Sequence, residues 1–178
     1  MPIQDDHFKL FDLPVRFALD ESALDAAYKR VQALVHPDRF AAGTAAERRI
    51  AMQWAARANE ALQTLRVPLR RGAYLCELNG VALEAESNTA MPPAFLTQQM
   101  QWREDLDAAR ENPGGNEVKD LLGAVTSERG ALLARLETAL DQARDFKAAA
   151  ALVRQLMFVE RFAAEVAAVA ESATAGAG

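Results

Sequence analysis

The sequence has very little cysteine and no long apolar run. Cys76 is the only thiol among the 178 residues, and one thiolate cannot hold an iron–sulfur cluster or a four-ligand zinc site. No stretch reaches the roughly 18 consecutive apolar residues that a transmembrane helix needs. The first residues, Met1 to Asp6, lack the basic and then apolar layout of a secretory signal. We therefore expect a cytoplasmic protein without membrane contact, and neither a metal nor another cofactor is implied.

An excess of positive charge is also missing, because the formal net charge is -5 at pH 7. Residues 1–72 hold 11 Lys and Arg against 9 Asp and Glu, whereas residues 73–178 hold 9 against 16. A protein that binds nucleic acid needs a broad basic surface to displace counterions from phosphates. This charge distribution argues against a nucleic-acid partner.

Few aromatic residues and no β-strand pattern are present. Hydrophobic residues make up 51% of the chain but aromatic residues only 7%, and no segment alternates polar and apolar residues over a useful length. A chain of this size can bury one modest core or two small ones. We predict an all-α fold with two small cores, joined by a short segment near Asn79 and Gly80.

An amphipathic run does occur, and it ends at a His-Pro-Asp triplet. Its apolar members recur at helical spacing and define one buried face: Leu24, Tyr28, Val31 and Val35. Lys29 and Arg30 project from other angles of this helix. Pro37 ends the helix and makes His36 its predicted last residue. Pro37 and Asp38 then form a rigid corner.

A second long helix is predicted after a loop at residues 40–44. Thr44 and Glu47 have the spacing of a capping box. The apolar stripe on the predicted helix has helical spacing and consists of Ile50, Trp54, Ala58, Ala61, Leu62 and Leu65. The two long helices should therefore pack as an antiparallel hairpin with the His-Pro-Asp loop at one end.

The hairpin resembles a J-domain, the module by which co-chaperones of the DnaJ class engage DnaK-type ATPases. The likeness rests on Tyr28-Lys29-Arg30 and His36-Pro37-Asp38-Arg39, supported by the Trp54 helix and by a short first helix at residues 6–14. It covers residues 5 to about 72, and we assign residues 1–76 to this domain. The resemblance implies that His36, Pro37 and Asp38 contact the ATPase, that Lys29 and Arg30 pair with its acids, and that ATP hydrolysis accelerates.

The rest of the chain resembles a particular kind of J-protein. Neither a glycine- and phenylalanine-rich linker nor Cys-x-x-Cys pairs follow the hairpin, and residues 93–107 (PAFLTQQMQWREDLD) are similar to the start of the C-terminal domain of the HscB family. These proteins are co-chaperones of iron–sulfur cluster biogenesis. We predict a connecting segment at 77–92, a C-terminal three-helix bundle at 93–171 and a disordered tail at 172–178. The last two helices are expected at about 117–140 and from about residue 145.

A second site is implied on the first bundle helix. Leu96, Met100 and Glu104 share one face, with Gln101 and Trp102 near its edges, while Phe95 and Leu106 point to the core. In the HscB family this helix, with an aromatic residue that aligns with Phe158, binds a cluster scaffold protein of the IscU type. Thr97, Gln101 and Ala108 depart from the family pattern and make the patch less acidic.

The resemblance implies a non-enzymatic co-chaperone that delivers an IscU-type scaffold to an HscA- or DnaK-type ATPase. One alternative is a J-protein that recruits a different client, which buried Leu96, Met100 and Phe158 would favour. Another is an unrelated helical adaptor in which His36 and Asp38 only cap local structure. An enzymatic role for His36 and Asp38 lacks a nucleophile and an orienting group.

Two further residues receive no functional role from the sequence. Cys76 is interpreted as a buried small hydrophobe within the mostly apolar stretch Ala73–Leu78. His7 lies beside two aspartates and is interpreted as an exposed residue of the first helix rather than as a metal ligand.

Overall fold

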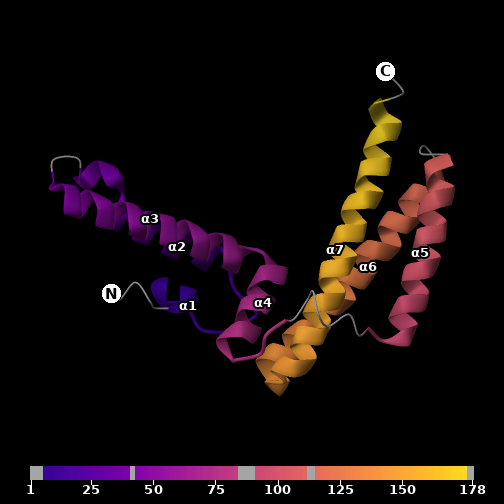
Figure 1. Cartoon of the computed structure of the whole chain (residues 1–178), viewed down its shortest axis with the longest axis horizontal. Helices are drawn as coiled ribbons and strands as arrows, with labels where there is room; N and C mark the ends of the chain where they lie inside the picture. The colour runs from indigo at the N-terminus through magenta and orange to yellow at the C-terminus, as the bar shows by residue number, and fades with distance from the viewer. Residues whose placement is uncertain (1–5, 41–42, 84–90, 112–114, 176–178) are drawn as a thin grey trace.

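The computed structural model describes residues 6–40, 43–83, 91–111 and 115–175, apart from the side chains of Pro37, Asp38 and residues 173–175. Every regular element in these ranges is helical (Figure 1), which confirms the all-α prediction. The elements in chain order are α1 (His7–Leu10), α2 (Glu21–Val35), the 3-10 turn η1 (Pro37–Phe40), α3 (Ala45–Arg66), α4 (Pro68–Leu78), α5 (Pro93–Glu111), α6 (Asn116–Glu137), the π-helical segment η2 (Thr138–Ala143) and α7 (Phe146–Ala175).

Side-chain caps set the starts of the first long helices. Asp20 accepts hydrogen bonds from the backbone N–H of Ser22, at 2.8 Å, and of Ala23, and thereby starts α2. Thr44 and Glu47 form the predicted capping box at the start of α3: the Glu47 N–H donates to Thr44 Oγ1 and the Thr44 N–H donates to Glu47 Oε2. Hydrogen bonds from the Thr44 backbone and hydroxyl lower the pKa of the Glu47 carboxyl.

The helices form a hairpin and a bundle (Figure 1). In the first part α2 and α3 pack together and α1 packs on α3, whereas in the second α5, α6 and α7 lie side by side. Helix α4 packs against both α3 and α7. It therefore joins the hairpin to the bundle.

Nearly all of the buried hydrophobic side chains form one connected cluster that extends from Phe8 of α1 to Val166 of α7. The prediction of two separate cores is therefore wrong. The two parts share one core because helix α4 belongs to both. Leu75 and Cys76 of α4 are buried, and the absence of a side chain at Gly72 lets Leu136 of α6 come close. Of the apolar positions predicted from periodicity on α2, Leu24 is fully buried in this core and Tyr28 and Val31 pack against it, whereas Val35 is half-buried outside it.

The predicted stripe on α3 is displaced by one residue at its start. Ile50 is 50% exposed, whereas Ala51 is 3% exposed. The other predicted members of the stripe are buried or half-buried.

His7 is not the exposed residue that the sequence suggested. It is 4% exposed, its ring stacks on Tyr74 at a centroid distance of 4.4 Å, and its backbone N–H donates to the Tyr74 hydroxyl at 3.0 Å. Burial lowers the pKa of His7, and nearby Arg57 lowers it further. The short helix α1 thus buries most of its length against α3 and α4.

The C-terminal boundaries also differ from the predictions. Helix α6 ends at Glu137 and continues as η2 rather than running to residue 140 as an α-helix. Helix α7 continues to Ala175, so residues 172–175 of the predicted disordered tail are helical. Part of the predicted connecting segment, residues 84–90, lies outside the described residues, as do 112–114 and 176–178.

Candidate partner-binding sites

Tyr28 fixes the rotation of α2 in the hairpin. Its hydroxyl donates to Asn59 Oδ1 of α3 at 2.8 Å and accepts from Gln32 Nε2 at 2.5 Å. Its ring meets Phe11 edge-on at 6.4 Å. With Tyr28 turned inward, the next two side chains, Lys29 and Arg30, are exposed to solvent. The structure therefore places both predicted basic contacts on an accessible face of α2.

The end of α2 has the predicted geometry, displaced by one residue. The last helical residue is Val35, and His36 is its C-cap with extended φ and ψ of -60° and 129°. His36 is exposed. The Arg39 N–H donates to the His36 carbonyl at 3.0 Å, and Arg39 Nη1 donates to the Ala33 carbonyl at 2.6 Å. Arg39 thus ties the 3-10 turn back to the last turn of α2.

The predicted contact residues of this loop are only partly described. The backbone of Pro37 and Asp38 belongs to η1, but their side chains lie outside the described residues, as does the loop at residues 41–42. Exposed apolar side chains also occur on the two helices that lead into and out of the turn: Leu34, Ile50 and Met52. Sequence reasoning did not assign these residues to the surface, because helical periodicity does not show which residues the hairpin covers.

Helix α5 presents the second predicted surface. Leu96 is 48% exposed and Met100 is 67% exposed, and Glu104 on the same face is exposed as well. Gln101 is exposed and its Nε2 donates to Asp105 Oδ1 at 3.0 Å. These four residues, Leu96, Met100, Gln101 and Glu104, form an accessible surface that we call the α5 face. Because these side chains are exposed, they are available to a partner and are not part of the hydrophobic core.

Phe158 of α7, the other residue predicted for this site, is half-buried and contacts α5 through Phe95. Its ring meets Phe95 edge-on at a centroid distance of 6.0 Å. The neighbouring Met157 is 36% exposed, and the sequence did not single it out. Met157 adds exposed apolar surface on α7.

Trp102 does not lie at the edge of the patch, as the sequence suggested, but in the core. It is 5% exposed and stacks on Phe162 at a centroid distance of 5.5 Å. The Arg103 guanidinium lies 5.3 Å from the centroid of the Phe162 ring, and its Nη1 donates to Glu165 Oε2 at 2.5 Å. These contacts hold α5 against α7 and leave the α5 face turned outward.

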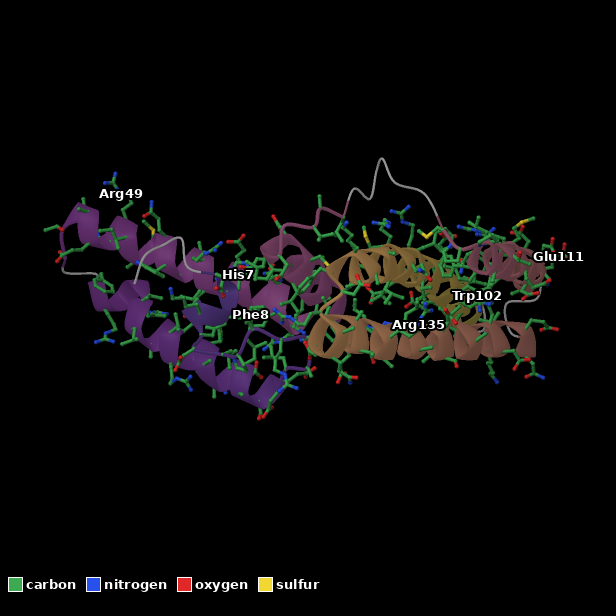
Figure 2. All side chains as sticks on the ribbon, turned by 90° about the horizontal axis from the view of Figure 1, so that it is seen from below. His7, Phe8, Arg49, Trp102, Glu111 and Arg135 are labelled. Carbon is green, nitrogen blue, oxygen red and sulfur yellow. The ribbon has the colours of Figure 1, made fainter. Side chains whose placement is uncertain are left out.

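The two surfaces lie in different parts of the molecule. In Figure 2, Arg49 near the hairpin tip and Glu111 at the end of α5 are at opposite ends of the long dimension. Among the described residues, no group of three or more His, Cys, Asp or Glu side chains could hold a metal ion. None of the helices in the described ranges combines the length and apolar character that a membrane crossing requires. The exposed features are thus two separate protein surfaces.

Comparison with known proteins decides the family. Residues 91–167 match the HSCB C-terminal oligomerisation domain. A co-chaperone protein HscB homolog of Burkholderia multivorans is 57% identical over 169 residues, which are 95% of this chain and 96% of that relative. The chain belongs to the HscB family of co-chaperones. A homolog of Burkholderia thailandensis is 56% identical over the same share of the chain.

Solved HscB structures share the fold of this HscB-family chain. Chaperone HscB from Vibrio cholerae aligns with a TM-score of 0.81 and 34% identity, covering 94% of this chain and 99% of that one. The human co-chaperone protein HscB aligns with a TM-score of 0.86 and 25% identity, covering 93% of this chain and 82% of that one. The likeness therefore includes both the N-terminal J-type hairpin and the C-terminal helical bundle.

Proposed function

We propose that this HscB-family chain delivers an iron–sulfur scaffold protein of the IscU type to an HscA- or DnaK-type ATPase and stimulates ATP hydrolysis by that ATPase. The observation that carries the proposal is the exposure of two separate surfaces. Lys29, Arg30 and His36 are accessible at the hairpin, and the α5 face is accessible on the bundle. The chain itself catalyses nothing in this scheme, because hydrolysis belongs to the ATPase.

At the hairpin, the proposed interaction is electrostatic and directional. Lys29 and Arg30 attract acidic groups of the ATPase and raise the encounter rate in a salt-dependent way. Asp38 offers a carboxylate that an arginine of the ATPase can bind with two charge-assisted hydrogen bonds. His36 and Pro37 complete the contact at the point where the helix ends.

On the bundle, the proposed interaction is mainly apolar. Leu96 and Met100 are exposed large hydrophobic residues on a helix whose other large apolar side chains are buried. Burying such a side chain contributes roughly 1.5–3 kcal/mol at full burial. Glu104 adds one acid, while Thr97 and Gln101 are uncharged. We therefore expect scaffold binding here to depend more on apolar contact than on salt.

The test is single-turnover ATP hydrolysis by an HscA-type ATPase, measured with and without an IscU-type scaffold. Asp38→Asn should abolish stimulation, whereas Asp120→Asn on α6 makes the same change of charge away from the hairpin and should behave as wild type. His36→Gln should also abolish stimulation while leaving helicity and scaffold binding intact. Stimulation that survives both hairpin substitutions would exclude the proposed docking mode.

Scaffold binding is tested with a double variant of the α5 face. Leu96→Ala with Met100→Ala should preserve scaffold-free stimulation and weaken scaffold binding at least tenfold, whereas Val15→Ala, an exposed apolar residue elsewhere, should leave both unchanged. Leu96→Ala with Phe158→Ala extends the test to α7. Unaltered scaffold affinity in the Leu96 and Met100 variant would contradict the proposed patch, and hairpin-dependent stimulation that ignores the scaffold would indicate a different client.

A further inference from the structure

The segment that leads into α2 is held by a residue from the far end of the chain. Asp141 accepts hydrogen bonds from the backbone N–H of Phe17, at 2.6 Å to Oδ1, and of Ala18, at 2.8 Å to Oδ2. Arg16 Nε lies 3.9 Å from Asp141 Oδ2. One carboxylate therefore uses both of its oxygens on two consecutive backbone donors, more than 120 residues away in sequence.

The local structure of the bundle directs Asp141 toward this segment. Asp141 lies in the π-helical η2, whose wider turn changes the side-chain direction relative to the preceding α-helix. Buried Ala139 and Leu140 anchor η2 in the core. Arg144 then adopts a left-handed conformation with φ of 55° and closes the segment. The connection between α6 and α7 is thus shaped so that Asp141 faces the N-terminal segment.

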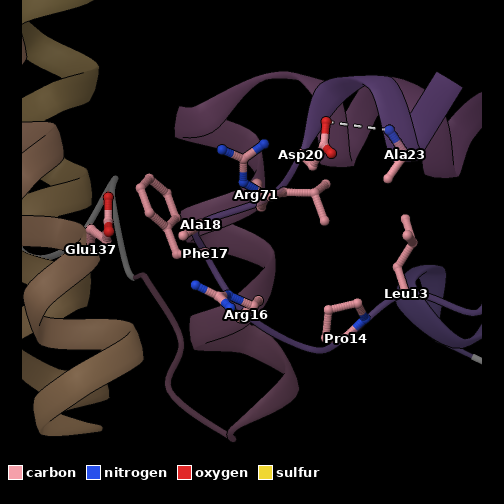
Figure 3. A pocket seen from close by; sticks show the side chains of 10 residues that line it. Leu13, Pro14, Arg16, Phe17, Ala18, Asp20, Ala23, Arg71 and Glu137 are labelled. Atoms are coloured by element: carbon pink, nitrogen blue, oxygen red, sulfur yellow. Dashed lines mark hydrogen bonds between the residues drawn. The ribbon is translucent and has the colours of Figure 1, made fainter.

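The side chain of Phe17, beside the carboxylate, is buried. Phe17 is 4% exposed, and the Arg71 guanidinium lies 5.0 Å from the centroid of its ring. Arg71 in turn donates from Nη1 to the Leu65 carbonyl at 2.6 Å. Figure 3 shows Arg71 and Phe17 beside a pocket of about 620 Å³ that Glu137 lines from the bundle side. Arg71 of α4 and Asp141 of the bundle therefore both contact Phe17, and Arg71 is in turn bonded to the Leu65 carbonyl of α3.

We propose that Asp141 is a positioning residue that sets the orientation of the hairpin relative to the α5 face. It does so through its two hydrogen bonds to the backbone of Phe17 and Ala18, which hold the segment leading into α2 and which we call the clasp. The segment that Asp141 holds ends at Asp20, the N-cap of α2, so displacement of Phe17 and Ala18 displaces the start of the helix that carries the docking residues. The role in coupling rests on the proposed function. The role of the clasp in orienting the hairpin does not depend on the proposed function.

The coupling follows from effective concentration. A scaffold bound at the α5 face reaches the ATPase only if the hairpin and the bundle hold their two partners in a fixed relation. A loosened clasp widens the range of orientations that the bundle takes relative to the docked hairpin, within the limits that the packing of α4 on α3 and α7 sets. Each surface would still bind its own partner, but the benefit of binding both at once would fall.

The clasp is tested without any partner. Spin labels on Arg49→Cys and Glu111→Cys, both exposed and at opposite ends of the molecule (Figure 2), report the distance distribution between hairpin tip and bundle end by double electron–electron resonance. Cys76 is buried and does not compete for the label. We expect a narrow distribution in the otherwise wild-type chain and a broader or displaced one in Asp141→Ala. A distribution as narrow and at the same distance in Asp141→Ala overturns the clasp.

Two further variants control this experiment. Glu137→Gln removes one negative charge from the same end of the bundle, but Glu137 accepts neither of the two backbone hydrogen bonds, so its distribution should match wild type. Asp141→Asn keeps one acceptor oxygen and should give a distance distribution intermediate between wild type and Asp141→Ala. This variant replaces Asp141→Ala in the test if Asp141→Ala fails to fold. Displacement of the distribution in Glu137→Gln to the same extent as in Asp141→Ala would overturn the specific role of the Asp141 carboxylate.

The coupling role is tested by the ATPase assay. In Asp141→Ala, scaffold-free stimulation and scaffold affinity should remain as in wild type, while the additional stimulation produced by scaffold should fall severalfold. A purely structural defect would lower scaffold-free stimulation, scaffold affinity and the additional stimulation by scaffold together. A broadened distribution with an undiminished scaffold effect overturns the coupling role. If even the wild type fails to stimulate, the proposed function fails, and the resonance experiment still decides the clasp.

Discussion

Gly72 of α4 lies directly against Leu136 of α6, so that a Cβ added at Gly72 would come within 2.8 Å of Leu136 Cδ2. The same Cβ would be 3.4 Å from Val153 Cγ2 of α7. This close approach is one of the contacts that join the hairpin side of the core to the bundle side.

We therefore predict that Gly72→Ala lowers the free energy of unfolding, by about 1–3 kcal/mol, because overpacking forces neighbouring side chains to move. Chemical denaturation monitored by circular dichroism measures this. Gly123→Ala is the matched control: Gly123 is also helical, and outside its own stretch of helix backbone nothing lies within 4 Å of the added Cβ. It should raise stability by roughly 0.5–1 kcal/mol. A stabilised Gly72→Ala variant would contradict the observed packing.

The buried His7 predicts a pH-dependent stability. Burial lowers its pKa below the ordinary value of 6.5, so the unfolded chain takes up a proton at a higher pH than the folded protein does. The free energy of unfolding should therefore fall as the pH drops from about 7 to 5. Carboxyl groups with lowered pKa values, such as Glu47, affect a lower pH range.

His7→Gln should reduce this dependence between pH 7 and 5, even though the loss of the stack on Tyr74 lowers stability at every pH. Urea denaturation at several pH values compares the two slopes. Equal slopes in the two proteins would show that His7 does not titrate differently in the folded and unfolded states.

Cys76 should be unreactive in the folded protein. It is fully buried, its Sγ lies 3.7 Å from the Phe146 carbonyl oxygen, and burial raises its pKa to about 11. Little thiolate is therefore present at pH 8, and an alkylating reagent has no access to it. Iodoacetamide should leave the native protein unmodified and alkylate one thiol in urea, as measured by mass spectrometry. Rapid stoichiometric alkylation of the native protein would be inconsistent with this burial.

The α5 helix should tolerate substitution on one face only. Met100 is 67% exposed, so Met100→Ala should change the free energy of unfolding by no more than about 0.5 kcal/mol. Trp102 is 5% exposed and stacked on Phe162, so Trp102→Ala should lower the free energy of unfolding by about 3–5 kcal/mol. Thermal denaturation distinguishes the two, and comparable losses in both variants would place Met100 in the core.

The sequence was sufficient for the fold class and for the positions of most helices, because the relevant signals are local. The capping box at Thr44 and the helix stop at Pro37 depend on residues within one turn of the chain. The exposure of Leu96 and Met100 agrees with the resemblance to the HscB family, although their binding role stays a prediction.

The errors arose where burial depends on segments distant in sequence. His7 is covered by Tyr74, which lies 67 residues away, and nothing next to His7 indicates that contact. Ile50 fits the helical period as well as Ala51 does, and only the neighbouring helix decides which of them is covered. The interaction of Asp141 with Phe17 was equally invisible, since it needs the whole chain to fold before the two residues meet.

Helix α4 limits how this protein can be divided. Because α4 packs on both α3 and α7, a fragment cut after residue 76 would carry Leu75 and Cys76 without the bundle that covers them. Such a fragment would expose apolar surface to water and tend to aggregate. Exchange of the hairpin between relatives therefore has to replace the α7 side chains that contact α4 at the same time, so the hairpin is not an interchangeable module.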